Sequence, residues 1–176
     1  MRKTVLANSL LFLFVAASFF FLWPVQKAVV FYYENTEDLI AYLPVKSGDT
    51  FQIIFTHSIH LTDVVEKYRV LEDGQIEQYE FVYEEYGIGM PANAEPGQQF
   101  LYEDGKFYIK NMNLRFPYMN VRNGKTVSKH RLAWDDNGEK MIWFNEYFNP
   151  GDWYTVKVEN LPRWKTLKGV KIKADG

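Results

Sequence analysis

The hydrophobic residues divide the chain into two unequal parts. An apolar run extends from Val5 to Val25, and the only polar residues inside it are Asn8, Ser9 and Ser18. About twenty apolar residues, at 1.5 Å per residue in a helix, are enough to cross a hydrocarbon core of ~30 Å. The pattern therefore predicts one N-terminal transmembrane helix within residues 1–27 and a separate domain over residues 28–176.

The run is long for a cleaved secretory signal, which is the alternative interpretation. A signal peptide has a shorter apolar core and ends at a small-x-small cleavage site, and residues 25–28 offer no clean pair of small residues. The sequence favours a retained anchor. Arg2 and Lys3 precede the run and should stay in the cytoplasm, because positive residues are retained on that side. We expect a single-pass protein of the cell membrane whose domain lies on the extracytoplasmic side.

After residue 28 the hydrophobic pattern has a period of two. In residues 50–58, Phe51, Ile53, Phe55 and His57 share one face. In residues 64–71, Glu66 and Tyr68 share one face with Val64 and Val70, and similar alternation recurs over 75–86 and 106–110. Turn dipeptides such as Asp73-Gly74 separate these runs and suit tight hairpins. This alternation is typical of half-buried strands. We predict an all-β domain, an antiparallel β-sandwich or open barrel of roughly eight to eleven strands.

Composition narrows the function classes. The chain has 20 basic residues, two of them before the apolar run, and all 22 acidic residues follow it, so the remainder carries a net charge of −4. This mild acidity argues against a nucleic-acid partner. The absence of cysteine excludes disulfides, thiolate metal sites and lipidation of a cysteine. The acidic residues lack the spacing of a calcium loop, so we predict neither a metal site nor a cofactor.

One polar pair stands out on an apolar face. His57 is expected to end the apolar face of its strand and Glu66 to lie on the apolar face of the next. If the strands form a hairpin, the two Cβ atoms should lie about 5–8 Å apart. One interpretation is that the two side chains hydrogen-bond to each other or to the backbone at the edge of the core. The other is that they line a pocket for a ligand or cation. Ser58 is adjacent to His57, but neighbouring strand residues point to opposite faces. A Ser-His-acid triad is therefore not expected, and we assign no catalytic residue.

A glycine-rich bend follows the predicted strand over residues 75–86. Gly87, Gly89 and Pro91 lack the third glycine and the following helix of a dinucleotide-binding loop. We interpret them as a sharp bend that forms the rim of the pocket at His57 and Glu66.

Three motifs together resemble a known bacterial family. They are Phe55-Thr56-His57-Ser58-Ile59, Val65-Glu66-Lys67-Tyr68 and Gly87-Ile88-Gly89-Met90-Pro91. This pattern is similar to the family called domain of unknown function 1850, whose members have an N-terminal membrane segment. They are often encoded beside the permease of TAXI-type TRAP transporters. The resemblance implies an accessory role in solute uptake, with a transporter permease or a solute-binding protein as partner, and it supplies no catalytic residues.

Two functions from different classes remain open. The first is a membrane-anchored binding or accessory module. The second is an extracytoplasmic hydrolase or small-ligand or cation-binding domain that uses His57, Ser58 and Glu66. Separately, the basic C-terminal run that includes Arg163, Lys165 and Lys168 either contacts anionic headgroups or is a solvated tail.

Overall fold

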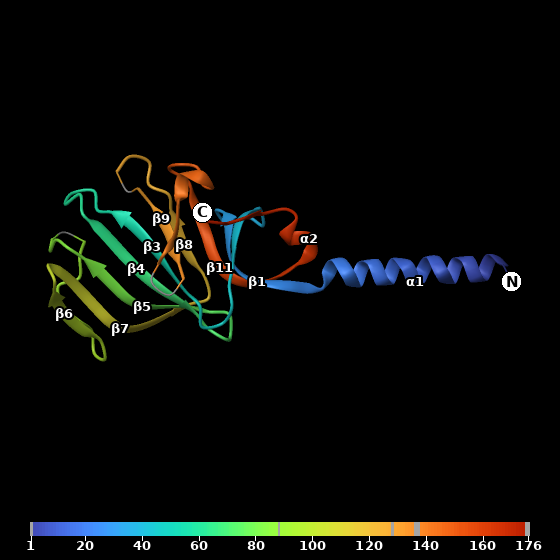
Figure 1. The fold of residues 1–176 in the computed structure, drawn as a ribbon, viewed down its shortest axis with the longest axis horizontal. Coiled ribbons are helices and arrows are strands. Elements are labelled where there is room, and N and C mark those ends of the chain that lie inside the picture. Colours follow the sequence, from blue (N-terminus) through green and yellow to red (C-terminus); the bar gives the residue numbers. More distant parts are fainter. Residues whose placement is uncertain (1, 88, 128, 136–137, 175–176) are drawn as a thin grey trace.

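The computed structural model describes residues 2–87, 89–127, 129–135 and 138–174, with side chains of the first helix described from Asn8 onward. An N-terminal helix, α1 (Arg2–Leu22), projects from one end of a β domain (Figure 1). The domain begins at once, because the first strand starts at Pro24. Residues 24–27, which the sequence placed in the N-terminal segment, are therefore part of a strand. Among the described residues, no helix combines the length and apolar character that a membrane crossing requires.

Twelve strands and two short helices make up the described part of the domain. They are β1 (Pro24–Tyr33), β2 (Leu39–Pro44), β3 (Thr50–Thr56), β4 (Asp63–Val70), β5 (Ile76–Tyr83), β6 (Gln99–Glu103), β7 (Lys106–Phe116), β8 (Met119–Arg122), β9 (Arg131–Trp134), β10 (Lys140–Trp143), η1 (Phe144–Glu146), β11 (Trp153–Pro162), α2 (Arg163–Thr166) and β12 (Val170–Lys171). The alternating runs predicted from the sequence correspond to β3, β4, β5 and β7.

The strands form two packed sheets of unequal width. One has five strands in the order β12-β2-β1-β11-β8, and the other has seven in the order β10-β9-β3-β4-β5-β7-β6. Neighbouring strands are antiparallel except for β12, which runs parallel to β2. The prediction of an all-β sandwich is confirmed.

The main core lies between the two sheets. Phe31 of β1, Phe51 of β3, Leu132 of β9 and Val156 of β11 are among its fully buried members. Phe31 packs against Phe144 and Phe148, with ring centroids 6.3 and 4.9 Å away. Aromatic side chains of this size contribute most of the apolar area that a small domain can bury.

Two of the turn dipeptides, Asp104-Gly105 and Asp73-Gly74, supply positive φ angles as the sequence predicts. In the hairpin between β6 and β7, Asp104 and Gly105 have φ angles of 50° and 77°. Two successive positive φ angles give a turn whose twist matches that of the flanking strands. Gly74, between β4 and β5, also has a positive φ of 84°.

Candidate functional site

A pocket of about 410 Å³ opens between the two sheets. Its floor is the inner face of β3 and β4, and its wall is β8 with the loop that follows. The lining residues are Ile53, Phe55, Glu66, Tyr68, Met119, Asn120, Val121, Arg122, Gly124 and His130. The pocket exists because β8 has only four residues, so the five-stranded sheet does not cover the whole inner face of the wider one.

Glu66 is the acidic side chain of this pocket. It lies on β4 opposite Ile53 of β3, and its Oε2 accepts a hydrogen bond of 2.8 Å from the Tyr68 hydroxyl. A carboxylate has about four acceptor positions, and Tyr68 supplies its one hydrogen bond among the described residues. Burial raises the pKa of Glu66, and the Tyr68 hydrogen bond partly offsets this increase. The side chain is therefore well placed to accept further hydrogen bonds from a ligand in the pocket.

Tyr68 and Glu66 reach the same face because they are two positions apart on one strand. Burial, together with the neighbouring Glu66 charge, raises the pKa of Tyr68. The phenol therefore stays protonated and acts as a donor. Its ring stacks on Phe51, with centroids 5.2 Å apart, which holds the hydroxyl in place.

His130 faces the same pocket from the loop between β8 and β9. Its imidazole lies between two aromatic rings, with centroids 5.6 Å from Phe55 and 5.5 Å from Phe144. Burial, and then the charge of Arg131, lowers its pKa to about 4. The backbone N–H of Gly124 donates to Nδ1 at 3.1 Å. In the neutral ring this leaves the proton on Nε2, so His130 presents a donor while Glu66 presents an acceptor.

The loop that carries His130 is fixed at its start by a buried amide. Asn123 donates from Nδ2 to Asn145 Oδ1 and to the Phe148 carbonyl, both at 2.9 Å. Its backbone N–H donates to the Asp152 carbonyl, also at 2.9 Å. These hydrogen bonds hold the buried Asn123 side chain and backbone in one position. The next residue, Gly124, is therefore held where its backbone N–H can donate to Nδ1 of His130.

His57, in contrast, does not lie beside Glu66. Thr56 pairs with Asp63, so β3 ends at Thr56 and His57 opens a six-residue loop. Ile53 and His57 are four residues apart, or about 13 Å along an extended chain, and Glu66 lies opposite Ile53. The register thus separates the predicted pair. His57 belongs to the loop and not to the strand, because its backbone N–H donates to the Thr62 carbonyl at 2.8 Å and closes the loop.

The imidazole of His57 is used within its own loop. Nδ1 accepts from the backbone N–H groups of Ile59 and His60, at 3.4 and 3.3 Å. The ring stacks on His60 with centroids 4.8 Å apart. Ser58 is exposed in the turn. The structure therefore does not assemble His57, Ser58 and Glu66 into one site.

The predicted rim lies against this loop rather than around Glu66. A Cβ on Gly87 would lie 2.5 Å from Nε2 of His60, which explains glycine at this position. Gly89 has a φ of 85°, and the carbonyl of Pro91 accepts a hydrogen bond from the Tyr83 hydroxyl. Gly87, Gly89 and Pro91 thus cover the end of the sheet near His60. They are not among the residues that line the pocket.

The residues that sequence reasoning missed are Tyr68, as a partner of Glu66, and His130. Tyr68 was detectable, since alternation already placed it on the face of Glu66. His130 had no local signal, because only the packing of one sheet on the other brings its loop to β4. Among the described residues, no group of three or more His, Asp or Glu side chains is arranged to hold a metal ion.

These features define the class of the protein as a β-sandwich with a pocket between its sheets that is largely apolar and contains a few polar side chains. The family model for the domain of unknown function DUF1850 matches residues 51–141. The match covers just over half of the chain, and the chain belongs to this family. All residues that line the pocket fall inside the matched range. Comparisons with curated proteins and with solved structures gave no match.

Acid should destabilise the fold through His130. The imidazole titrates near pH 4 when folded and near about 6.5 when unfolded. Between these values the unfolded state binds more protons, so the free energy of unfolding falls as the pH falls. At a pH below both pKa values, the contribution of the neutral His130 to the free energy of unfolding is lost completely. Urea titrations at about pH 7 and about pH 4.5 should show a smaller acid loss in His130→Gln than in the wild type. Lys125→Gln, on the same loop, should behave like the wild type, and an unchanged acid loss in His130→Gln would contradict the assignment.

Glu66 should be energetically coupled to Tyr68 and independent of His57. Tyr68→Phe removes only the hydroxyl and should cost about 1.5–3 kcal/mol, the usual range for a hydrogen bond to a charged group. A double-mutant cycle with Glu66→Ala should give a coupling of about 0.5–3 kcal/mol. The same cycle between Glu66→Ala and His57→Ala should be additive within about 0.5 kcal/mol. Strong coupling to His57, or additivity with Tyr68, would refute this geometry.

Proposed function

We propose that this protein is a membrane-attached accessory module that binds a small polar solute in the pocket at Glu66 and His130. The observation that carries the proposal is the unused acceptor capacity of Glu66. Glu66 is half-buried, and a carboxylate partly removed from water is costly unless hydrogen bonds compensate it. Tyr68 provides one such bond, and the remaining acceptor positions face an open pocket. A ligand that donates hydrogen bonds would complete the set.

The pocket combines polar and apolar surfaces in the way that small-molecule sites do. Phe55 and Val121 supply apolar walls, while Asn120 and Arg122 stand at the side formed by β8. Arg122 is held by a hydrogen bond of 3.1 Å from its Nε to the Gly151 carbonyl. The donor of His130 and the acceptor of Glu66 together suit a solute that carries both acceptor and donor groups, whereas the Arg122 side chain is exposed on the other face of β8.

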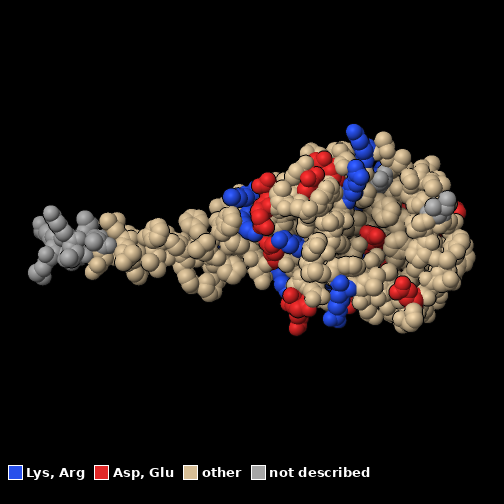
Figure 2. Space-filling view, turned by 180° about the vertical axis from the view of Figure 1, so that it is seen from behind, with Lys and Arg blue, Asp and Glu red and all other residues tan. Residues whose placement is uncertain are grey.

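The surface of α1 supports attachment to a membrane. Phe12 and Phe14 are 72% and 71% exposed, and Figure 2 shows no charged side chain on the described part of the helix. A helix that is apolar on all sides needs an apolar environment around it. Counted from the sequence, the apolar part of α1 from Val5 to Leu22 extends about 27 Å at ~1.5 Å per residue, close to the ~30 Å of a bilayer core. We further propose that the domain lies on the extracytoplasmic side, in accordance with Arg2 and Lys3 at the opposite end.

The attachment restricts the partners that the domain can reach. β1 starts at Pro24, two positions after α1 ends, so no flexible linker separates the two. A domain held this closely has a high effective concentration for membrane-proximal partners. The family resemblance suggests a permease of the TRAP type, or its solute-binding protein, as that partner. A hydrolase built on His57, Ser58 and Glu66 is not favoured, because the register keeps Glu66 away from the other two.

The proposal predicts that the full-length protein is recovered with a multi-span permease. A C-terminally tagged chain should co-purify with the permease from mild detergent, and protease added to intact spheroplasts should remove the domain and abolish the recovery. Loss of the gene should reduce uptake of that transporter's solute, and Glu66→Gln should restore uptake less well than wild type. Glu103→Gln, an exposed change on β6 of the same sheet, is the matched control. A protected C-terminus, or full uptake with Glu66→Gln, would contradict the proposal.

A further inference from the structure

The segment 163–170, which we call the juxtamembrane segment, consists of α2 and the turn that leads into β12. One side of it is fixed to the outer face of the five-stranded sheet. Lys165 Nζ donates to the Tyr32 hydroxyl at 2.8 Å and lies 3.3 Å from Glu159 Oε2. The Tyr42 hydroxyl donates to the Thr166 carbonyl at 3.4 Å. The backbone of the segment is therefore held in a defined position.

Close packing at Gly169 confirms this fixation. A Cβ at Gly169 would lie 2.7 Å from Cγ of Leu39, so the turn approaches β2 more closely than any side chain would allow. Beyond the turn, β12 pairs with β2, and the Ile172 N–H donates to the Tyr42 carbonyl at 2.9 Å. The segment is thus not a frayed tail.

The opposite side of the juxtamembrane segment is apolar and basic. Leu167 and Val170 are 77% and 57% exposed, and Trp164 is 36% exposed. Lys165 is paired with Glu159, with Glu37 at 4.0 Å. Within the described part of the chain, Arg163 and Lys168 have no carboxylate partner. Exposed apolar side chains beside unpaired cations are the composition of a membrane-surface contact.

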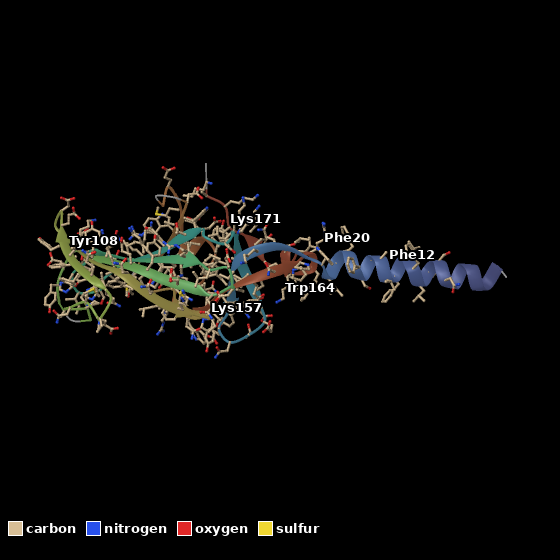
Figure 3. The ribbon with its side chains drawn as sticks, turned by 90° about the horizontal axis from the view of Figure 1, so that it is seen from below. Phe12, Phe20, Tyr108, Lys157, Trp164 and Lys171 are labelled. Atoms are coloured by element: carbon tan, nitrogen blue, oxygen red, sulfur yellow. The ribbon has the colours of Figure 1, made fainter. Side chains whose placement is uncertain are left out.

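The position of the segment agrees with its composition. Trp164 lines a groove together with Ser18 and Leu22 of α1, and the Arg163 guanidinium lies 4.1 Å from the ring centroid of Phe20. Figure 3 shows Trp164 beside the end of α1 that enters the domain. Ser18 and Leu22 are separated by about 6 Å along the helix axis. Once α1 is in a bilayer, the segment therefore lies at the level of the headgroups.

We propose that the juxtamembrane segment is a second membrane contact that binds anionic lipid headgroups. Arg163 and Lys168 pair with lipid phosphates, Trp164 occupies the interface, and Leu167 and Val170 enter the outer acyl region. Each cation near an anionic surface favours the bound state by a factor of about five. The inference rests on the membrane attachment proposed above and adds that the domain is held in one orientation. The exposed apolar side chains favour a lipid surface over free phosphate, which would contact the cations alone.

The absence of cysteine from the chain allows a direct test on the full-length protein. Single variants Leu167→Cys, Phe14→Cys and Tyr102→Cys are labelled with a nitroxide and reconstituted in two kinds of vesicle. One contains phosphatidylcholine alone, and the other contains phosphatidylcholine with about a third phosphatidylglycerol. Electron paramagnetic resonance then compares the accessibility of each label to oxygen, which concentrates in lipid, and to a water-soluble nickel complex. Tyr102, on β6 at the end of the domain far from α1 (Figure 1), reports the aqueous baseline.

We expect the label at position 167 to be lipid-accessible with phosphatidylglycerol and markedly less so without it. Arg163→Gln combined with Lys168→Gln should remove the difference, as should ionic strength of about 1 M, where the screening length is ~3 Å. A label at 167 that matches the one at 102 in both vesicles would overturn the inference. The label at position 14 tests separately whether α1 is inserted in the bilayer. If it lies in lipid while 167 stays aqueous, only the second contact fails; if it is aqueous, the proposed attachment fails.

Discussion

The partial burial of the Glu66 carboxylate is the constraint on which the site depends. The sandwich places it on the inner face of β4, where burial raises its pKa and Tyr68 alone donates to it among the described groups. A core position filled by an apolar residue would cost the fold less. The carboxylate is tolerated because the surface beside it is open, and the same opening gives a ligand access to its unused acceptor positions.

The unequal width of the two sheets produces that opening. The seven-stranded sheet extends beyond the five-stranded one, and β8 supplies only the four residues Met119–Arg122 at this edge. The loop that follows folds back over the gap, anchored by Asn123, and brings His130 to the pocket. The polar groups of the site thus come from one strand of the wide sheet and from one loop. This arrangement places the donor and the acceptor in the lining of one pocket.

The sequence predicted the architecture better than the site. Alternation located β3, β4 and β5 to within a few residues and placed Glu66 and Tyr68 on one face, because the period of a strand is set locally. It misplaced His57, because the end of β3 depends on the hydrogen bond from His57 to Thr62, which no periodicity reveals. His130 was missed altogether. Its position depends on Asn123 meeting Asn145 and Phe148, contacts that exist only after the sheets have packed.

The most direct test is the titration of Glu66 itself, followed by NMR through the carboxyl carbon of the side chain in the ligand-free protein. We predict a midpoint above the ordinary value for glutamate of about 4.3, because burial disfavours the ionised form. In Tyr68→Phe the midpoint should rise further, since the hydroxyl that stabilises the carboxylate is gone. A midpoint at or below the ordinary value, or one that Tyr68→Phe leaves unchanged, would show that Glu66 is already satisfied by the fold. That result would contradict its role as an open acceptor in a ligand site.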